Sequence, residues 1–229
     1  MKALILAAGY ATRLYPLTKD FPKPLLEVGG KPIINYLVEK INKLAGIDTI
    51  LVITNDRFFG HFQEWSRRIQ SDKRIKVLND QTKDEKSRRG AIGDIHYTIK
   101  QEGIDENLIV VGGDNLFDGS LDDFVNFART KEDSPCIGLY DVGRTEDAEK
   151  YGVVYIDAEN RIFDFKEKPK KPSSTLVAMC LYYFPQSKIG LIEEYMGERK
   201  DKDASGFYIE WLKDRCPVYG FIFSGRWFD

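Results

Sequence analysis

The chain has 229 residues, enough for one domain with a sizeable core. Its 42 % hydrophobic and 13 % aromatic content excludes a disordered chain, and its net charge of -2 excludes a general attraction to nucleic acid or to membranes. No apolar run approaches the ~20 residues that span a bilayer, and the start of the chain does not have the pattern of a signal peptide. Cysteines without a CxxC pair predict a reduced, cytoplasmic protein, and we interpret all of them as small core residues: Cys136, Cys180 and Cys216.

Apolar runs alternate with helical patterns through the first half of the chain. The runs predict buried strands at 3–8, 49–54, 75–78 and 108–111. Apolar residues at helical spacing predict helices at 33–44, 58–69 and 92–99. The charged stretch between the third strand and the third helix predicts a loop. This order of elements predicts a mostly parallel sheet with helices on both faces.

The second half has a different texture. Residues 153–156 and 162–165 flank a turn, which predicts a β-hairpin. Further strands are predicted at 178–184, 218–223 and 227–228, and a short helix at 207–212. Because no linker or repeat interrupts the chain, we expect one α/β domain over 1–229, Rossmann-like, with a mixed, mostly parallel sheet flanked by helices.

The turn after the first strand has a composition suited to phosphate. Small residues at Ala8 and Gly9 allow backbone N–H groups to approach phosphate oxygens, and Arg13 has the geometry to grip phosphate with two hydrogen bonds. The turn is neither a Walker P-loop nor a G-x-G-x-x-G motif. An ordinary connection between a strand and a helix is the alternative.

Two further features follow the turn. Pro22 and Pro24 stiffen the backbone around Lys23, which suits a cation positioned against a phosphoryl group; an exposed lysine in a turn is the alternative. Asp114 follows the strand at 108–111 and a pair of glycines, a suitable place for a carboxylate that holds Mg²⁺. The same aspartate could instead cap a helix.

Together these segments resemble the signature of the sugar-1-phosphate nucleotidyltransferases, a group that contains glucose-1-phosphate thymidylyltransferases, uridylyltransferases and mannose-1-phosphate guanylyltransferases. The matching motifs extend over essentially the whole chain in the expected order, at 6–18, 22–25, 30–33, 113–115, 151–154, 165–169 and 227–229. Each motif is weak alone, but their order is specific. The resemblance implies a nucleotide-binding half at 1–115 and a sugar-phosphate-binding half at 116–229.

The resemblance also implies a role for individual residues. It assigns nucleotide binding to Ala8, Gly9, Thr12, Gly90 and Asp114. It assigns catalysis, through neutralisation of phosphate charge, to Arg13 and Lys23. It assigns sugar-phosphate binding to Gly152, Glu167 and Lys168. It assigns the Mg²⁺ cofactor to Asp114 and Asp229.

The implied reaction is in-line attack of a sugar 1-phosphate on the α-phosphorus of a nucleoside triphosphate, with loss of pyrophosphate. Ala11 replaces a glycine of the family pattern, and 81–89 lacks the base-binding pattern of thymidylyltransferases. The triphosphate therefore stays open among UTP, dTTP, CTP and GTP. Two other functions also stay open: a cytidylyltransferase for a non-sugar phosphate or phosphonate such as phosphocholine, and a non-catalytic regulatory subunit. Exposed aromatic residues would mark a contact between copies if the chain forms a homo-oligomer.

Overall fold

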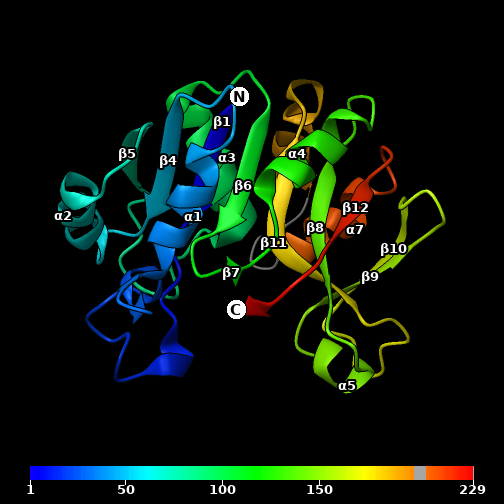
Figure 1. The fold of residues 1–229 in the computed structure, drawn as a ribbon, viewed down its shortest axis with the longest axis horizontal. Coiled ribbons are helices and arrows are strands. Elements are labelled where there is room, and N and C mark those ends of the chain that lie inside the picture. Colours follow the sequence, from blue (N-terminus) through cyan, green and yellow to red (C-terminus); the bar gives the residue numbers. More distant parts are fainter. Residues whose placement is uncertain (199–204, 229) are drawn as a thin grey trace.

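The computed structural model describes residues 1–198 and 205–228 (Figure 1). Within this part of the chain, a nine-stranded sheet has the order β10-β9-β11-β6-β1-β4-β5, and β8 pairs with both β11 and β12. Its strands are β1 (Lys2–Leu6), β4 (Thr49–Thr54), β5 (Arg74–Asn79), β6 (Leu108–Gly112), β8 (Cys136–Asp141), β9 (Gly152–Ile156), β10 (Ile162–Glu167), β11 (Leu176–Phe184) and β12 (Tyr219–Phe223). Two small sheets pair β2 (Glu27–Val28) with β3 (Lys31–Pro32) and β7 (Leu116–Phe117) with β13 (Trp227–Phe228).

The nucleotide-binding half predicted from sequence has a parallel sheet. Strands β6, β1, β4 and β5 all run in the same direction, with Leu6 opposite Gly112 at the carboxyl end. Their apolar runs arise because both faces of these strands are covered. The strand expected over 3–8 ends at Leu6, although the Ala7 N–H still donates to the Ile53 carbonyl at 2.8 Å and so continues the pairing with β4. The carboxyl ends of the parallel strands therefore meet at one edge.

Strand β11 makes the sheet mixed. It runs antiparallel to β6 and to β8, and β8 is parallel to β12. Between Ala178 and Tyr182 its register shifts in a bulge, where Cys180 has a φ of 52°. The hairpin predicted from sequence is confirmed as β9 and β10, which pair antiparallel. The expected mixed sheet with helices around it is thus confirmed.

Helices cover both faces of the sheet (Figure 1). They are α1 (Ile33–Asn42), α2 (Phe59–Arg68), α3 (Gly90–Glu102), α4 (Leu121–Arg129), α5 (Thr145–Ala148), α6 (Gly190–Glu198) and α7 (Ser205–Leu212). Short 3-10 turns lie at η1 (Thr12–Leu14), η2 (Lys23–Leu25) and η3 (Gln186–Lys188). In the described part of the chain, no helix has the length and apolarity needed to cross a membrane.

Alternating side chains of β1 supply two separate cores. Ala3 and Ile5 pack in the core under α1, α2 and α4, and Leu4 packs in the core under α3, α6 and α7. All three residues are fully buried. This burial on both faces fixes β1 in the centre of the molecule, so the turn after it has a rigid support.

Candidate active site

A cleft of about 300 Å³ lies at the carboxyl ends of the parallel strands. Ligand sites in open α/β sheets lie at this edge. Its wall draws on several segments of the chain and includes Ala8, Gly9, Lys23, Gly90, Asp94 and Asp114. Five of these residues belong to the site predicted from the resemblance, and the structure brings those five together. Asp94 was not predicted, because nothing in its immediate sequence separates it from an exposed helical aspartate.

The cleft contains an ion pair between Lys23 and Asp114. Lys23 Nζ lies 2.9 Å from Asp114 Oδ2, and the two side chains are 22 % and 35 % exposed. Pro24 follows Lys23 directly in η2 and is buried, so the lysine projects from a stiff backbone. The structure therefore presents one cation and one carboxylate at the position where the sequence predicts phosphate and metal.

The turn after β1 is held by side chains from neighbouring strands and loops. Asn55 Nδ2 donates to the Ala8 carbonyl at 2.9 Å, and Thr18 Oγ1 donates to the Ala11 carbonyl at 2.7 Å. Ala11 adopts a left-handed conformation with a φ of 47°. Glycine suits that conformation better than alanine, which explains in physical terms the glycine of the family pattern. A Cβ added to Gly9 would meet no atom within 4 Å, so the space beside it opens towards the cleft.

Two predicted residues lie outside the cleft wall. Thr12 and Arg13 belong to η1, and the Arg13 side chain is exposed. The structure brings neither of them against the Lys23–Asp114 pair. Their contact with a triphosphate stays a prediction.

The predicted sugar-phosphate residues cluster where β9, β10 and α7 meet. The Glu167 side chain is 13 % exposed, and its Oε1 lies 3.6 Å from Lys168 Nζ. Burial raises the pKa of Glu167, and the Lys168 charge partly opposes that shift. A Cβ on Gly152 would overlap Phe165, so this glycine makes room for the protein's own side chain; its contact with a sugar stays a prediction.

Gly206 is a residue of this cluster that sequence reasoning missed. It lies in the first turn of α7, and a Cβ there would overlap the Glu167 carboxylate. A glycine inside a short helix was the available signal. The absence of a side chain at this position permits α7 to pack directly against Glu167.

Strand β11 runs between the cleft and this cluster. Cys180 forms no disulfide, lines the cleft and packs partly buried against the core, so the prediction of a core residue holds fully for Cys136 and in part for Cys216 and Cys180. Cys180 lies in the bulge, where its side chain contacts both the core and the cleft. Two residues further, Tyr182 is buried and donates from its hydroxyl to Ser205 Oγ at 2.7 Å. Burial raises the pKa of Tyr182 well above its usual value, and the nearby Glu167 charge adds to the shift.

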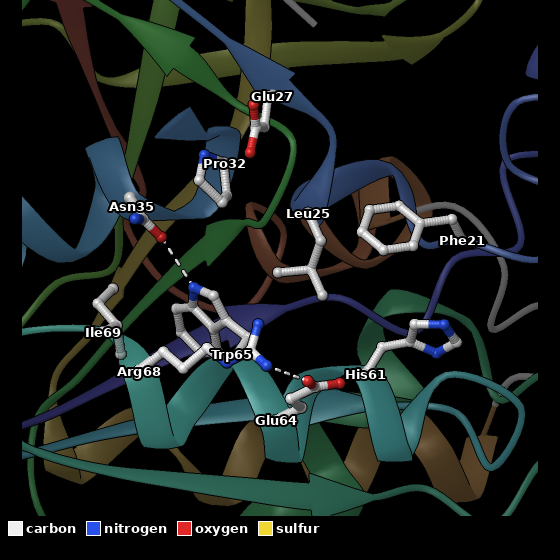
Figure 2. A pocket seen from close by; sticks show the side chains of 10 residues that line it. All are labelled: Phe21, Leu25, Glu27, Pro32, Asn35, His61, Glu64, Trp65, Arg68 and Ile69. Carbon is white, nitrogen blue, oxygen red and sulfur yellow. Dashed lines mark hydrogen bonds and ion pairs between the residues drawn. The ribbon is translucent and has the colours of Figure 1, made fainter. Parts of the chain in front are cut away.

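The segment around Lys23 also lines a second cavity, of about 310 Å³ (Figure 2). Phe21 and Leu25 face this cavity, whereas Lys23 and Pro24 face the cleft. The opposite wall belongs to α2, where Trp65 Nε1 donates to Asn35 Oδ1 at 2.8 Å. One short turn therefore forms the wall between two cavities.

The metal site predicted from the resemblance is described only in part. Asp229 lies outside the described residues. Across the described ranges, no cluster of three or more acidic, cysteine or histidine side chains could hold a metal. Asp114 nevertheless fits Mg²⁺, which commonly uses one or two protein carboxylates with the remaining positions filled by substrate phosphates and water.

A model of the nucleotidyl transferase family matches residues 2–229. The bifunctional protein GlmU of Methanocaldococcus jannaschii is 29 % identical over the whole chain, which spans 51 % of that relative. The glucose-1-phosphate adenylyltransferase of Fusobacterium nucleatum is 30 % identical over 99 % of the chain and 62 % of its own length. The chain thus spans about half to two thirds of these curated relatives.

A solved structure agrees with these matches. A putative glucose-1-phosphate thymidylyltransferase from Bacillus anthracis superposes with a TM-score of 0.80 at 26 % identity. The match covers 100 % of this chain and 89 % of the other. A UDP-glucose pyrophosphorylase in complex with UDP-glucose has a TM-score of 0.81 at 22 % identity, a likeness of fold.

Proposed function

The chain belongs to the nucleotidyl transferase family, and on that basis we propose that it transfers a nucleotidyl group from a nucleoside triphosphate to a sugar 1-phosphate. The observation that carries the proposal is the Lys23–Asp114 pair, 2.9 Å apart in the cleft beside Gly9. A cation and an open backbone turn bind phosphate oxygens, and a carboxylate can hold the Mg²⁺ that accompanies a triphosphate. The resemblance to sugar-1-phosphate nucleotidyltransferases agrees with the named relatives.

The reaction needs no general base, because the attacking oxygen of the sugar phosphate is already an anion. That oxygen bonds to the α-phosphorus, the bond from the α-phosphorus to the β-phosphate oxygen breaks, and pyrophosphate leaves with the electron pair. The obstacle is repulsion between two polyanions. Lys23 neutralises charge on the reacting phosphates, and Arg13 and Lys168 add positive charge on either side. Mg²⁺, held by Asp114 with Asp229, would neutralise further phosphate charge.

The acceptor is a sugar 1-phosphate in this proposal because of Glu167. Its carboxylate is mostly buried beside Gly206 and Lys168, where it can accept hydrogen bonds from hydroxyl groups. A phosphocholine-like acceptor has no hydroxyl for Glu167 to bind. The retained Lys23 and Asp114 argue against a regulatory subunit. The adenylyltransferase relative adds ATP to the four triphosphates already expected as donors. A cytoplasmic location is also proposed, because none of the cysteines forms a disulfide.

Pyrophosphate release tests the proposal directly. UTP, dTTP, CTP, GTP and ATP are each combined with glucose 1-phosphate, mannose 1-phosphate, glucosamine 1-phosphate and phosphocholine, with and without Mg²⁺. The proposal expects turnover with at least one sugar 1-phosphate. Turnover only with CTP and phosphocholine would replace the sugar with a non-sugar acceptor. If no combination releases pyrophosphate, the result would favour the non-catalytic regulatory subunit.

A further inference from the structure

A pair of buried acids lies beside the cleft. Asp80 directly follows β5, and Asp94 lies in the second turn of α3; they are 1 % and 6 % exposed. The Asp80 carboxylate accepts hydrogen bonds from the Thr82 N–H at 2.7 Å and from Thr82 Oγ1 at 2.8 and 2.9 Å. Asp80 therefore has the hydrogen bonds that stabilise an ionised carboxylate, and Asp94 does not have an equivalent set.

The surroundings of Asp94 favour the protonated, neutral form of its carboxyl group. Its Oδ1 is buried and has no hydrogen-bond partner in the described part of the chain. Burial, with the Asp80 charge adding to it, raises the pKa of Asp94 to about 8. A neutral Asp94 can donate its proton to Asp80, which removes the repulsion between the two acids and leaves one Asp94 oxygen as an acceptor.

The other charged and titratable groups near the two acids do not reverse the rise in the pKa of Asp94. Arg89 lowers the pKa of both acids, but its Nε donates at 2.8 Å to the Asp80 carbonyl and its guanidinium lies 4.3 Å above the Tyr97 ring. Other such groups in the cleft or around the pair are Tyr10, Lys23, Arg57, Asp84, Arg88, Asp114 and Cys180. The net result remains a raised pKa at Asp94.

The location of Asp94 in the cleft indicates which part of a bound nucleotide it contacts. Asp94 and Gly90 line the wall formed by α3, whereas Gly9, Lys23 and Asp114 lie on the segments after β1 and β6. An acid pair repels phosphate. A neutral acceptor in a cleft wall instead suits an uncharged hydrogen-bond donor. The N–H groups of the base and the hydroxyl groups of the ribose are such donors, and of these the base N–H groups are the ones that distinguish one nucleobase from another.

We propose that Asp94, held in place by Asp80, reads the nucleobase by accepting a hydrogen bond from an N–H group on the edge of the base. This inference rests on the proposed function for the identity of the ligand. Under this proposal Asp94 contributes to base selection, and base recognition is separate from the phosphate contacts of Lys23.

Asparagine supplies a matched test. The amide of Asp94→Asn donates to Asp80 and keeps a carbonyl acceptor, so it imitates the neutral acid permanently, whereas Asp94→Ala removes the acceptor. Calorimetry in buffer with Mg²⁺ measures binding of the five nucleoside triphosphates and of tripolyphosphate, which has no base. We expect Asp94→Ala to weaken the preferred nucleotide about 5- to 10-fold, the value of one hydrogen bond, and to leave tripolyphosphate unchanged. Asp94→Asn should bind like the wild type.

A pH series supplies the second readout. Between about pH 6.5 and about pH 9 the wild type should lose nucleotide affinity as Asp94 ionises, because a second carboxylate charge beside Asp80 then repels the triphosphate, and Asp94→Asn should lose less. Asp72→Asn, an exposed acid outside the cleft wall, controls for the change of net charge. Denaturation curves establish that each variant folds; if Asp94→Ala does not fold, Asp94→Asn and its pH series decide the question.

Three results would overturn the inference. One is an equal loss of tripolyphosphate and nucleotide affinity in Asp94→Ala, and another is unchanged nucleotide affinity in that variant. The third is a pH series in which the wild type and Asp94→Asn coincide. Base-selective binding that depends on Asp94, together with no pyrophosphate release from any substrate pair, would instead refute the proposed transfer reaction and support the inference.

Discussion

Replacing Lys23 with alanine separates catalysis from stability. Lys23 Nζ lies 2.9 Å from Asp114 Oδ2, with the side chains 22 % and 35 % exposed. Unit charges ~4 Å apart attract by about 4 kcal/mol near a protein surface, but solvent screening and lost side-chain entropy reduce the net value of such pairs to about 1 kcal/mol or less. A positioned cation that meets charge developing in the transition state is worth about 3–4 kcal/mol. We therefore expect turnover to fall about 10²- to 10³-fold, and the free energy of unfolding to change by about 1 kcal/mol or less.

Two assays check this separation. Pyrophosphate release at saturating substrate gives kcat, and urea denaturation gives the free energy of unfolding. Lys19→Ala is the control, because Lys19 is an exposed lysine of the preceding turn outside the cleft wall; it should change neither quantity. Near wild-type turnover in Lys23→Ala would refute the assignment. A loss of activity matched by a loss of several kcal/mol of stability would show that the pair maintains the fold.

Three further predictions concern stability. Between the ordinary aspartate pKa of about 4 and the raised value of about 8, native Asp94 holds a proton that the unfolded chain lacks. The free energy of unfolding should therefore fall as pH rises through this window. Urea denaturation curves should show a smaller fall in Asp94→Asn. Ala11→Gly should relieve the left-handed strain and raise the free energy of unfolding by up to about 1 kcal/mol; a loss would show that the turn tolerates alanine without strain. Gly206→Ala should lower the melting temperature, with a cost of about 1–3 kcal/mol, because its Cβ overlaps the Glu167 carboxylate. Gly60→Ala, a helical glycine with open space around it, should not lower it; equal effects of the two would contradict the packing argument.

The sequence predicted the parallel strands well because burial on both faces demands continuous apolar runs. The strand expected at 49–54 coincides with β4. Helix α4 was missed although its signals were present: Phe124 and Ala128 are buried at helical spacing, and Ser120 Oγ accepts from the Asp123 N–H at 3.2 Å. Strand β8 and helix α6 were also not predicted.

The candidate site was predicted where short motifs carry its residues, as with Gly9, Lys23 and Asp114. The contacts of Asp94 and Gly206 depend instead on segments brought together by folding. The pKa of Asp94 is raised first by burial and then by the charge of Asp80, and both effects arise only on folding. Gly206 matters only because α7 packs on the end of β10. No local pattern encodes the Asp94 contact, and the one local signal at Gly206 is a glycine inside a short helix.

Strand β11 links the two halves of the chain and therefore limits recombination between relatives of this protein. Met179 and Leu181 pack in the core under α1, α2 and α4, while Tyr182 and Phe184 pack in the core on the other face. The same strand pairs with β6 of the first half and with β8 of the second. A recombination that joins the first half of one relative to the second half of another therefore creates mismatches in both cores at once. Under the proposed function, acceptor preference is thus expected to diversify through point substitutions around Glu167, because wholesale replacement of the second half disrupts β11.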